Sequence, residues 1–312
     1  MRVLFWGTPA FAAPALRALL GEGFDVVGVV TRPDRPAGRG RRITPPPIKV
    51  MAEDEALLVL QPEKAGDPEF LAQARALQPD VGVVTAYGRF LPRAALDLPT
   101  HGTVNVHPSL LPELRGAAPV QWALIRGMER TGVSVIRLVE EMDAGPILRQ
   151  VEEPILPGES AAELSMRLAE LGAEALIEAL TLLDAGQLEE REQDHEAATL
   201  APAIGVEDAR IDWTRTPTEN AGWIRGTDSV PGAWTLFGGS RLKVFRPEVD
   251  PSAPTGEPGR VLDVEPDGRG VLVASGDGGL WIGEVQPEGR RRMATGAWLR
   301  GSGLAPGQLL GE

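Results

Sequence analysis

The stretch VLFWGTPAFAAPALRALLGEGFDVVGVVT, residues 3–31, decides the fold class. It predicts an apolar strand over Val3–Gly7, a helix over Pro9–Leu20 that begins at a proline, and a second apolar strand over Asp25–Thr31. Strands that are apolar along their length, with helices between them, are typical of a parallel sheet covered on both faces.

Similar apolar runs continue to about residue 150. Further strands are expected over Leu57–Pro62, Asp80–Tyr87, Gly102–Pro108 and Gly132–Leu138. We therefore expect an α/β fold with a doubly wound, mostly parallel sheet of the Rossmann-like kind. In such folds ligands bind beyond the carboxyl ends of the strands.

A long amphipathic helix is expected over Ala161–Asp184, after the last of these strands. Ser160 and Glu163 form a capping box at its start, and leucines recur at helical spacing along it. The stretch that follows is polar, contains a proline and indicates a linker.

From Ile211 onward, short apolar runs alternate with close-set turns such as Pro266–Gly268 and Asp277–Gly279. This texture predicts a small antiparallel, OB-like β-barrel, with one of its short strands in MATGAWLRG, residues 293–301. The expected organisation is a catalytic domain over 1–187, a linker over 188–208 and a barrel domain over 209–312.

Composition excludes several classes of protein. The 312 residues carry a net charge of −13, which argues against non-specific coating of nucleic acid but allows a local basic patch. Cysteine is absent and there are only 3 histidines, so disulfides, thiolate nucleophiles and Cys-based or His-rich metal sites are not expected. No run approaches the ~18 apolar residues of a membrane helix, and no signal peptide is evident, so a soluble cytoplasmic protein without membrane contact is expected.

The first strand is not followed by a nucleotide motif. Gly7–Phe11 reads GTPAF, which is neither the dinucleotide fingerprint nor a phosphate-binding loop, and Pro9 lacks the N–H that a phosphate cradle uses. A nicotinamide or ATP site is therefore not expected there.

The strongest candidate site lies in TVNVHPSLLPELRGAAPVQWAL, residues 103–124. Asn105 and His107 are two positions apart at the carboxyl end of a strand, so both side chains point to one face. An imidazole can move a proton near neutral pH, and an amide can stabilise an oxyanion. The alternative is that both side chains only satisfy the backbone of the turn that follows.

Asp143 follows the next strand, in EEMDAGPIL, residues 140–148. It lies at a carboxyl end as His107 does, and an aspartate facing a histidine orients the ring and stabilises its cationic form. Asp143 could instead only cap the turn. His101 and His195 are weaker candidates, because one precedes its strand and the other lies in the linker.

A third feature is the basic loop TRPDRPAGRGRRITPPPIKV, residues 31–50. It holds six cations and the single acid Asp34, which predicts contact with a polyanion such as nucleic acid. Arginine favours forked contacts to phosphate. A solvated loop without a partner is the alternative.

Several stretches together resemble the methionyl-tRNA formyltransferases along essentially the whole chain. They are GTPAFAAPAL (7–16), TRPDRPAGRGRR (31–42), TAYGRFLP (85–92), NVHPSLLPELRGAAPVQWAL (105–124), GVSVIRLVEEMDAGPIL (132–148), IDWT (211–214) and PGAW (231–234). The resemblance implies transfer of a formyl group from 10-formyltetrahydrofolate to the α-amine of methionyl initiator tRNA. It implies neither a metal nor a stable protein partner.

The resemblance also implies roles for individual residues. Asn105, His107 and Asp143 match the catalytic trio. The cofactor-binding positions are Ser109, Leu110, Leu111, Pro112, Tyr87, Gly88 and Leu91, and the tRNA-binding positions are Arg35, Arg39, Arg41, Arg42 and Lys49. Two enzymatic alternatives stay open: a formyltransferase that acts on a small amine, and a formyltetrahydrofolate hydrolase.

Overall fold

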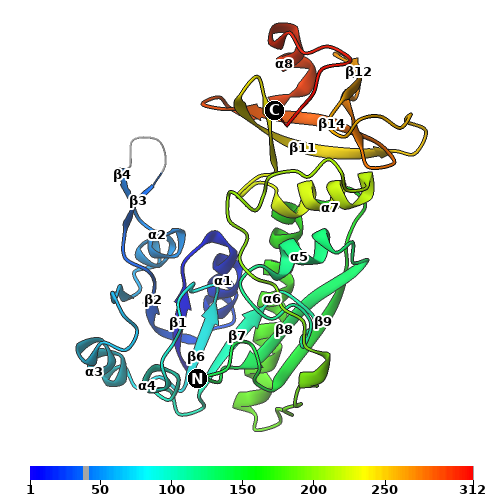
Figure 1. Cartoon of the computed structure of the whole chain (residues 1–312). Helices are drawn as coiled ribbons and strands as arrows, with labels where there is room; N and C mark the ends of the chain where they lie inside the picture. The colour runs from blue at the N-terminus through cyan, green and yellow to red at the C-terminus, as the bar shows by residue number, and fades with distance from the viewer. Residues whose placement is uncertain (38–41, 312) are drawn as a thin grey trace. The chain divides into compact units, whose positions relative to one another are not determined.

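The computed structural model describes residues 1–37 and 42–311, with the backbone alone at residues 37 and 42 (Figure 1). The chain forms two compact units. The first consists of Met1–Gly116, Thr131–Glu153 and Ser165–Leu200, and the second of Ala117–Arg130, Pro154–Leu164 and the chain from Ala201.

The first unit contains a seven-stranded sheet in the order β5-β2-β1-β6-β7-β8-β9. Its strands are β1 (Arg2–Gly7), β2 (Asp25–Val30), β5 (Val59–Leu60), β6 (Val81–Thr85), β7 (Thr103–His107), β8 (Arg130–Arg137) and β9 (Ile147–Pro154). The first five in the order are parallel to one another, whereas β8 runs antiparallel to β7. The predicted mostly parallel α/β sheet is confirmed.

Helices cover both faces of this sheet because its central strands are apolar throughout. They are η1 (Ala10–Ala12), α1 (Ala13–Gly21), α2 (Pro47–Asp54), α3 (Pro68–Ala76), α4 (Arg93–Leu96) and α6 (Ala161–Asp184). Leu4 and Trp6 of β1 pack in one cluster with Phe70 of α3. On the opposite side Gly172 of α6 approaches Val106, where any larger side chain would meet the valine.

The predicted capping box begins α6 as expected. The backbone N–H of Ser160 donates to the Glu163 carboxylate at 2.9 Å, and the N–H of Glu163 faces Ser160 Oγ at 3.4 Å. The hydrogen bonds from Ser160 lower the pKa of Glu163 below its ordinary value; partial burial opposes this shift, and Arg246 adds to it. The cap therefore fixes where the longest helix starts.

The basic loop forms a hairpin of β3 (Arg35–Ala37) and β4 (Arg42–Thr44). Arg35 pairs with Thr44 and Ala37 with Arg42. The predicted tRNA-binding positions Arg39 and Arg41 lie outside the described residues, as does the side chain of Arg42.

The second unit contains an antiparallel sheet in the order β10-β11-β14-β13-β12, with β15 on β14. The strands are β10 (Trp234–Phe237), β11 (Ser240–Asp250), β12 (Val261–Glu265), β13 (Gly270–Ser275), β14 (Gly278–Pro287) and β15 (Met293–Ala294). Residues 307–311 hydrogen-bond to both edges of this sheet: Val261 of β12 donates to Gln308, and Gly311 donates to Leu236 of β10. This segment therefore links the two edge strands of the antiparallel sheet.

The stretch MATGAWLRG was expected to be a strand, and that prediction is wrong beyond its first two residues. It forms α8 (Thr295–Ser302). Trp298 and Leu299, which pack against the core, follow buried Thr295 by three and four positions. That spacing puts the three side chains on one face of a helix, so tertiary packing selects the helix.

Two further helices, α5 (Pro119–Ile125) and α7 (Pro217–Thr227), pack closely within the second unit. A Cβ at Gly222 or Gly226 would lie 2.8 or 2.7 Å from backbone oxygens of the α5 region, so only glycine permits this approach. The contact groups 117–130 with the second unit, although the sequence suggested one domain over 1–187. In the described part of the chain, no helix has the length and hydropathy needed to cross a membrane.

Candidate active site

Strand β7 brings Asn105 and His107 to one face at its carboxyl end. Asn105 lies between Val84 of β6 and Ile136 of β8, and His107 lies opposite Ser134. Asn105 is half-buried, and its side-chain amide makes no hydrogen bond to any described residue. Two amide protons and a carbonyl oxygen are therefore available to a ligand at this edge.

His107 is 4% exposed and both ring nitrogens face oxygen atoms. Nε2 lies 3.0 Å from the carbonyl oxygen of Leu114, and because a carbonyl only accepts, Nε2 carries the proton of this hydrogen bond. Nδ1 lies 3.6 Å from Oδ2 of Asp143. The structure thus brings together the imidazole and the carboxylate that the sequence placed 36 positions apart.

Asp143 is held in an unusual backbone conformation. Its φ is +52°, a region that costs a non-glycine residue roughly 1–3 kcal/mol. Oδ2 accepts a hydrogen bond from the N–H of Gly116 at 2.9 Å. Gly145, two residues on, passes so close to the Arg137 carbonyl oxygen that a Cβ would clash with it. The turn thus aims the carboxylate at the end of β7.

The loop after β7 is fixed by side chains from neighbouring strands. Ser134 Oγ donates to the Ser109 carbonyl at 2.7 Å and accepts from the N–H of Leu111 at 3.0 Å. The Gln150 amide donates to the Leu111 carbonyl and to Ser134 Oγ, both at 2.9 Å. Sequence reasoning missed Ser134 and Gln150, because each acts on the backbone of a segment that is distant in the sequence.

The predicted cofactor-binding residues divide by exposure. Ser109, Leu111, Leu91 and Tyr87 are buried, and burial raises the pKa of the Tyr87 hydroxyl. Their side chains pack inward, so only backbone groups can meet a ligand there. The remaining three are accessible: Leu110 and Pro112 are half-buried, and Gly88 is exposed with φ +76°.

The predicted tRNA-binding residues differ in whether their charge is exposed or paired within the protein. Arg35 is exposed on the hairpin. Lys49 instead lies 2.8 Å from the Asp34 carboxylate, and Gln61 donates to the same carboxylate. The hydrogen bonds from Gln61 and Lys49 lower the pKa of Asp34, and Asp34 raises the pKa of Lys49. The Lys49 charge is therefore largely compensated within the protein.

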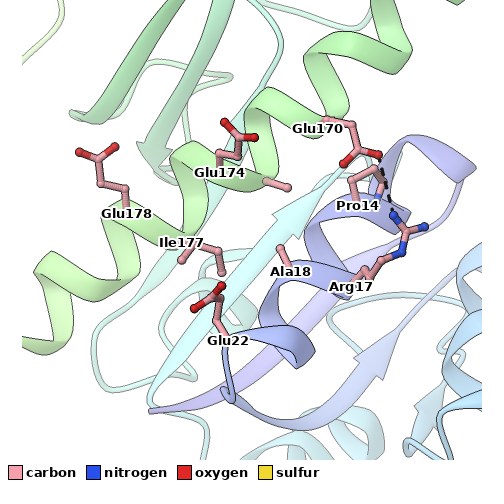
Figure 2. A pocket seen from close by; sticks show the side chains of 9 residues that line it. Pro14, Arg17, Ala18, Glu22, Glu170, Glu174, Ile177 and Glu178 are labelled. Carbon is pink, nitrogen blue, oxygen red and sulfur yellow. Dashed lines mark ion pairs between the residues drawn. The ribbon is translucent and has the colours of Figure 1, made fainter.

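A hollow of about 440 Å³ lies between α1 and α6 (Figure 2). Four glutamates line it, and Arg17 pairs with one of them, Glu170, at 3.8 Å. None of the predicted site residues lines it. Within the described ranges, no group of three or more metal-ligating side chains lies close enough to hold an ion.

Two family models match the chain. The formyl transferase model covers residues 1–180, and the model of the formyl transferase C-terminal domain covers residues 203–303. The class defined by the fold and the site is that of the formyl transferases.

Relatives that match the chain along its full length identify the family within this class. The chain is 45% identical over 313 residues to the methionyl-tRNA formyltransferase of Geobacter sulfurreducens, covering 100% of this chain and 97% of that protein. It is 47% identical to the methionyl-tRNA formyltransferase of Desulfotalea psychrophila, covering 99% of this chain and 95% of that protein. The chain belongs to the methionyl-tRNA formyltransferase family.

Solved structures with lower identity share the fold. HypX from Aquifex aeolicus in complex with tetrahydrofolic acid is 20% identical, with a TM-score of 0.64 over 96% of this chain and 47% of that chain. WlaRD, a sugar 3N-formyl transferase, is 14% identical, with a TM-score of 0.67 over 93% of this chain and 99% of that chain.

Proposed function

We propose that the protein transfers a formyl group from 10-formyltetrahydrofolate to the α-amino group of methionyl initiator tRNA, for translation initiation in the cytoplasm. The observation that carries this proposal is the amide, imidazole and carboxylate of Asn105, His107 and Asp143 at the edge of the sheet. Support comes from the names of the full-length relatives and from WlaRD, whose structure was determined in the presence of 5-N-formyl-THF.

When bound, the folate supplies a formyl carbon that an uncharged amine can attack. Asn105 would donate a hydrogen bond to the formyl oxygen, where negative charge develops during that attack. Its amide is suited to this role because no described residue competes for it. One such donor contributes roughly 3–4 kcal/mol to a transition state.

His107 would donate a second hydrogen bond to the same oxygen. Its Nε2–H is bound to the Leu114 carbonyl, so His107 would exchange that partner for the formyl oxygen. Asp143 would keep the ring in its orientation and assist removal of a proton from the attacking amine. The new bond joins the amine nitrogen to the formyl carbon, the bond from that carbon to N10 of the folate breaks, and N10 gains a proton in place of the one that the amine loses.

The folate would lie against the loop after β7 and the residues after β6. Leu110, Pro112 and Gly88 offer accessible apolar surface and backbone groups, which fits a flat heteroaromatic ring with donors and acceptors at its rim. Ser109, Leu111, Tyr87 and Leu91 would contribute through their backbone and by supporting the loop.

The tRNA would meet the basic hairpin and the barrel domain over 209–312. Arg35, Arg39, Arg41 and Arg42 would contact phosphates, so binding would weaken as salt rises. Lys49 would act at the base of the hairpin through its ion pair with Asp34.

A formyl-transfer assay tests the proposal. The purified protein would be mixed with 10-formyltetrahydrofolate and methionyl initiator tRNA, with elongator methionyl-tRNA, free methionine and an amino sugar in parallel. We expect formylation of the initiator alone. Transfer to a small amine, or release of formate without any transfer, would contradict the proposal and favour the corresponding alternative.

A further inference from the structure

The segment 191–200, within the predicted linker, runs along both loops of the candidate active site. Arg191 exchanges backbone hydrogen bonds with Ile147, at 2.7 and 2.9 Å, just after the Asp143 turn. Thr199 accepts from the N–H of Arg115 at 2.8 Å through its carbonyl, and from the N–H of Leu114 at 2.9 Å through Oγ1. The segment is therefore a structural part of the first unit and spans from one loop to the other.

Gln193 is the residue of this segment that enters the interior, with 6% of its surface exposed. Its Nε2 donates to the carbonyl of Asp143 at 2.8 Å and to the carbonyl of Gly145 at 2.7 Å. Its Oε1 accepts from Arg115, at 2.7 Å from Nη2 and 3.2 Å from Nε. Both protons and the oxygen of the amide are engaged, which fixes its orientation.

Arg115 is equally buried and lies near the same turn. Its Nη2 also donates to His195 Nδ1 at 3.1 Å, and Nη1 lies 3.9 Å from Glu141. The next residue, Gly116, is the one whose N–H binds the Asp143 carboxylate. The Arg115–Gln193 pair therefore connects the backbone of Asp143 with the peptide that holds its side chain.

We propose that Gln193, oriented by Arg115, is a positioning residue for Asp143. The inference rests on the function proposed above for Asp143. The amide of Gln193 binds the carbonyl oxygens at and two residues after Asp143, and so holds the left-handed backbone that aims the carboxylate at His107. A reacting group that shifts by about 1 Å loses up to roughly 100-fold in rate, so such anchoring has a measurable effect.

Gln193→Glu is the most direct variant. It keeps the shape and the acceptor for Arg115 but replaces the two N–H donors by an oxygen that faces two carbonyls. We expect kcat for formyl transfer to fall about 10-fold, with KM for tRNA and for the formyl donor within twofold. Gln193→Met removes the amide without adding charge and should behave alike. Gln187→Glu, at an exposed position shortly before the segment, is the matched control.

A double-mutant cycle shows whether Gln193 acts through Asp143. In an Asp143→Asn background, Gln193→Glu should cost nothing further in kcat. The proposal would be overturned if the losses in kcat from the two substitutions multiplied. It would also be overturned if the Gln193 variants raised KM with kcat unchanged, or if neither of them lost activity.

Amide hydrogen exchange separates this inference from the proposed reaction. In Gln193→Glu and Gln193→Met, exchange should accelerate at least 10-fold in peptides covering 141–147, and stay unchanged in β1. Unchanged exchange in the 141–147 peptides would overturn the positioning role whatever reaction the enzyme carries out. A wild-type protein without formyl transfer would overturn the proposed function alone, since the exchange result still decides the role of Gln193.

Discussion

Asp143 Oδ2 lies 3.6 Å from Nδ1 of His107 and simultaneously accepts a hydrogen bond from the N–H of Gly116. The second ring nitrogen of His107 is bound to a backbone carbonyl. The imidazole is thus held between a carboxylate and a carbonyl, and the two contacts together fix the ring at the end of β7.

Asp143→Asn should abolish most of the activity. The amide is isosteric and can still accept from Gly116, but it lacks the charge that faces His107. We expect kcat to fall by about 10²–10⁴ with unchanged folate binding, measured by formyl transfer and by fluorescence titration of the folate. Asp97→Asn on the exposed end of α4 is the control. A loss below threefold would remove Asp143 from the mechanism.

Asn105→Ala should reduce kcat by about 10²–10³, because it removes a donor to the developing oxyanion. Asn105→Asp should be as slow, since a carboxylate cannot donate. The melting temperature should hardly change, because the Asn105 amide bonds to no described residue. Near-normal rates in both variants, measured at saturating tRNA, would show that the amide only fills the end of β7.

Arg35 and Lys49 should differ in how they affect tRNA binding. Arg35 is exposed, so Arg35→Ala should reduce the slope of log affinity against log salt by about one. Lys49 is paired with Asp34, so Lys49→Ala should change the slope less and destabilise the base of the hairpin. Filter binding of initiator tRNA at several salt concentrations measures both. Equal slopes for the two variants would contradict the distinction.

Asp250 should make the barrel unit sensitive to acid. Hydrogen bonds from Ser252 and from Trp281 Nε1, with Arg269 nearby, hold its pKa well below the ordinary value. A depressed carboxyl pKa stabilises the fold above the unfolded-state pKa of about 3.9, and this contribution is lost as pH falls below it.

Thermal unfolding of wild type and Asp250→Asn between pH 7 and 2.5 checks this expectation. The variant should be less stable at pH 7, and the difference should shrink as pH falls below about 4. Asp277→Asn, in an exposed turn, is the control. A difference that stays constant over the whole range would show that the Asp250 charge contributes nothing to stability.

Local sequence patterns were sufficient to predict the strands and helices whose apolar residues recur at a regular spacing. The strands around Val3–Gly7 and Asp25–Thr31 and the helix over Ala161–Asp184 appear as expected, because apolar period and a capping box specify them without distant contacts. The same patterns placed Asn105 and His107 on one face of a strand, where the structure has them.

The features that could not be predicted from the sequence depend on contacts between residues far apart in the chain. The direction of β8 cannot be derived from its apolar run, which would suit either orientation. Thr295–Ser302 becomes a helix because Trp298 and Leu299 meet the barrel core. Gln193 lies in a polar stretch with no periodicity, and its importance follows only from carbonyls 48 and 50 positions earlier in the chain.

The 191–200 segment has a consequence for synthesis and for fragment design. Strand β7, which carries both Asn105 and His107, leaves the ribosome well before Gln193, which follows Arg115 by 78 residues. A nascent chain that ends between Asp143 and Gln193, or a fragment cut at residue 187, would contain all three predicted catalytic side chains. It would nevertheless leave the buried Arg115 guanidinium without the acceptor that Gln193 supplies, and the turn of Asp143 without its anchor. A fragment that ends at Leu200 would retain both the Gln193 anchor and the hydrogen bonds of Thr199 to Leu114 and Arg115.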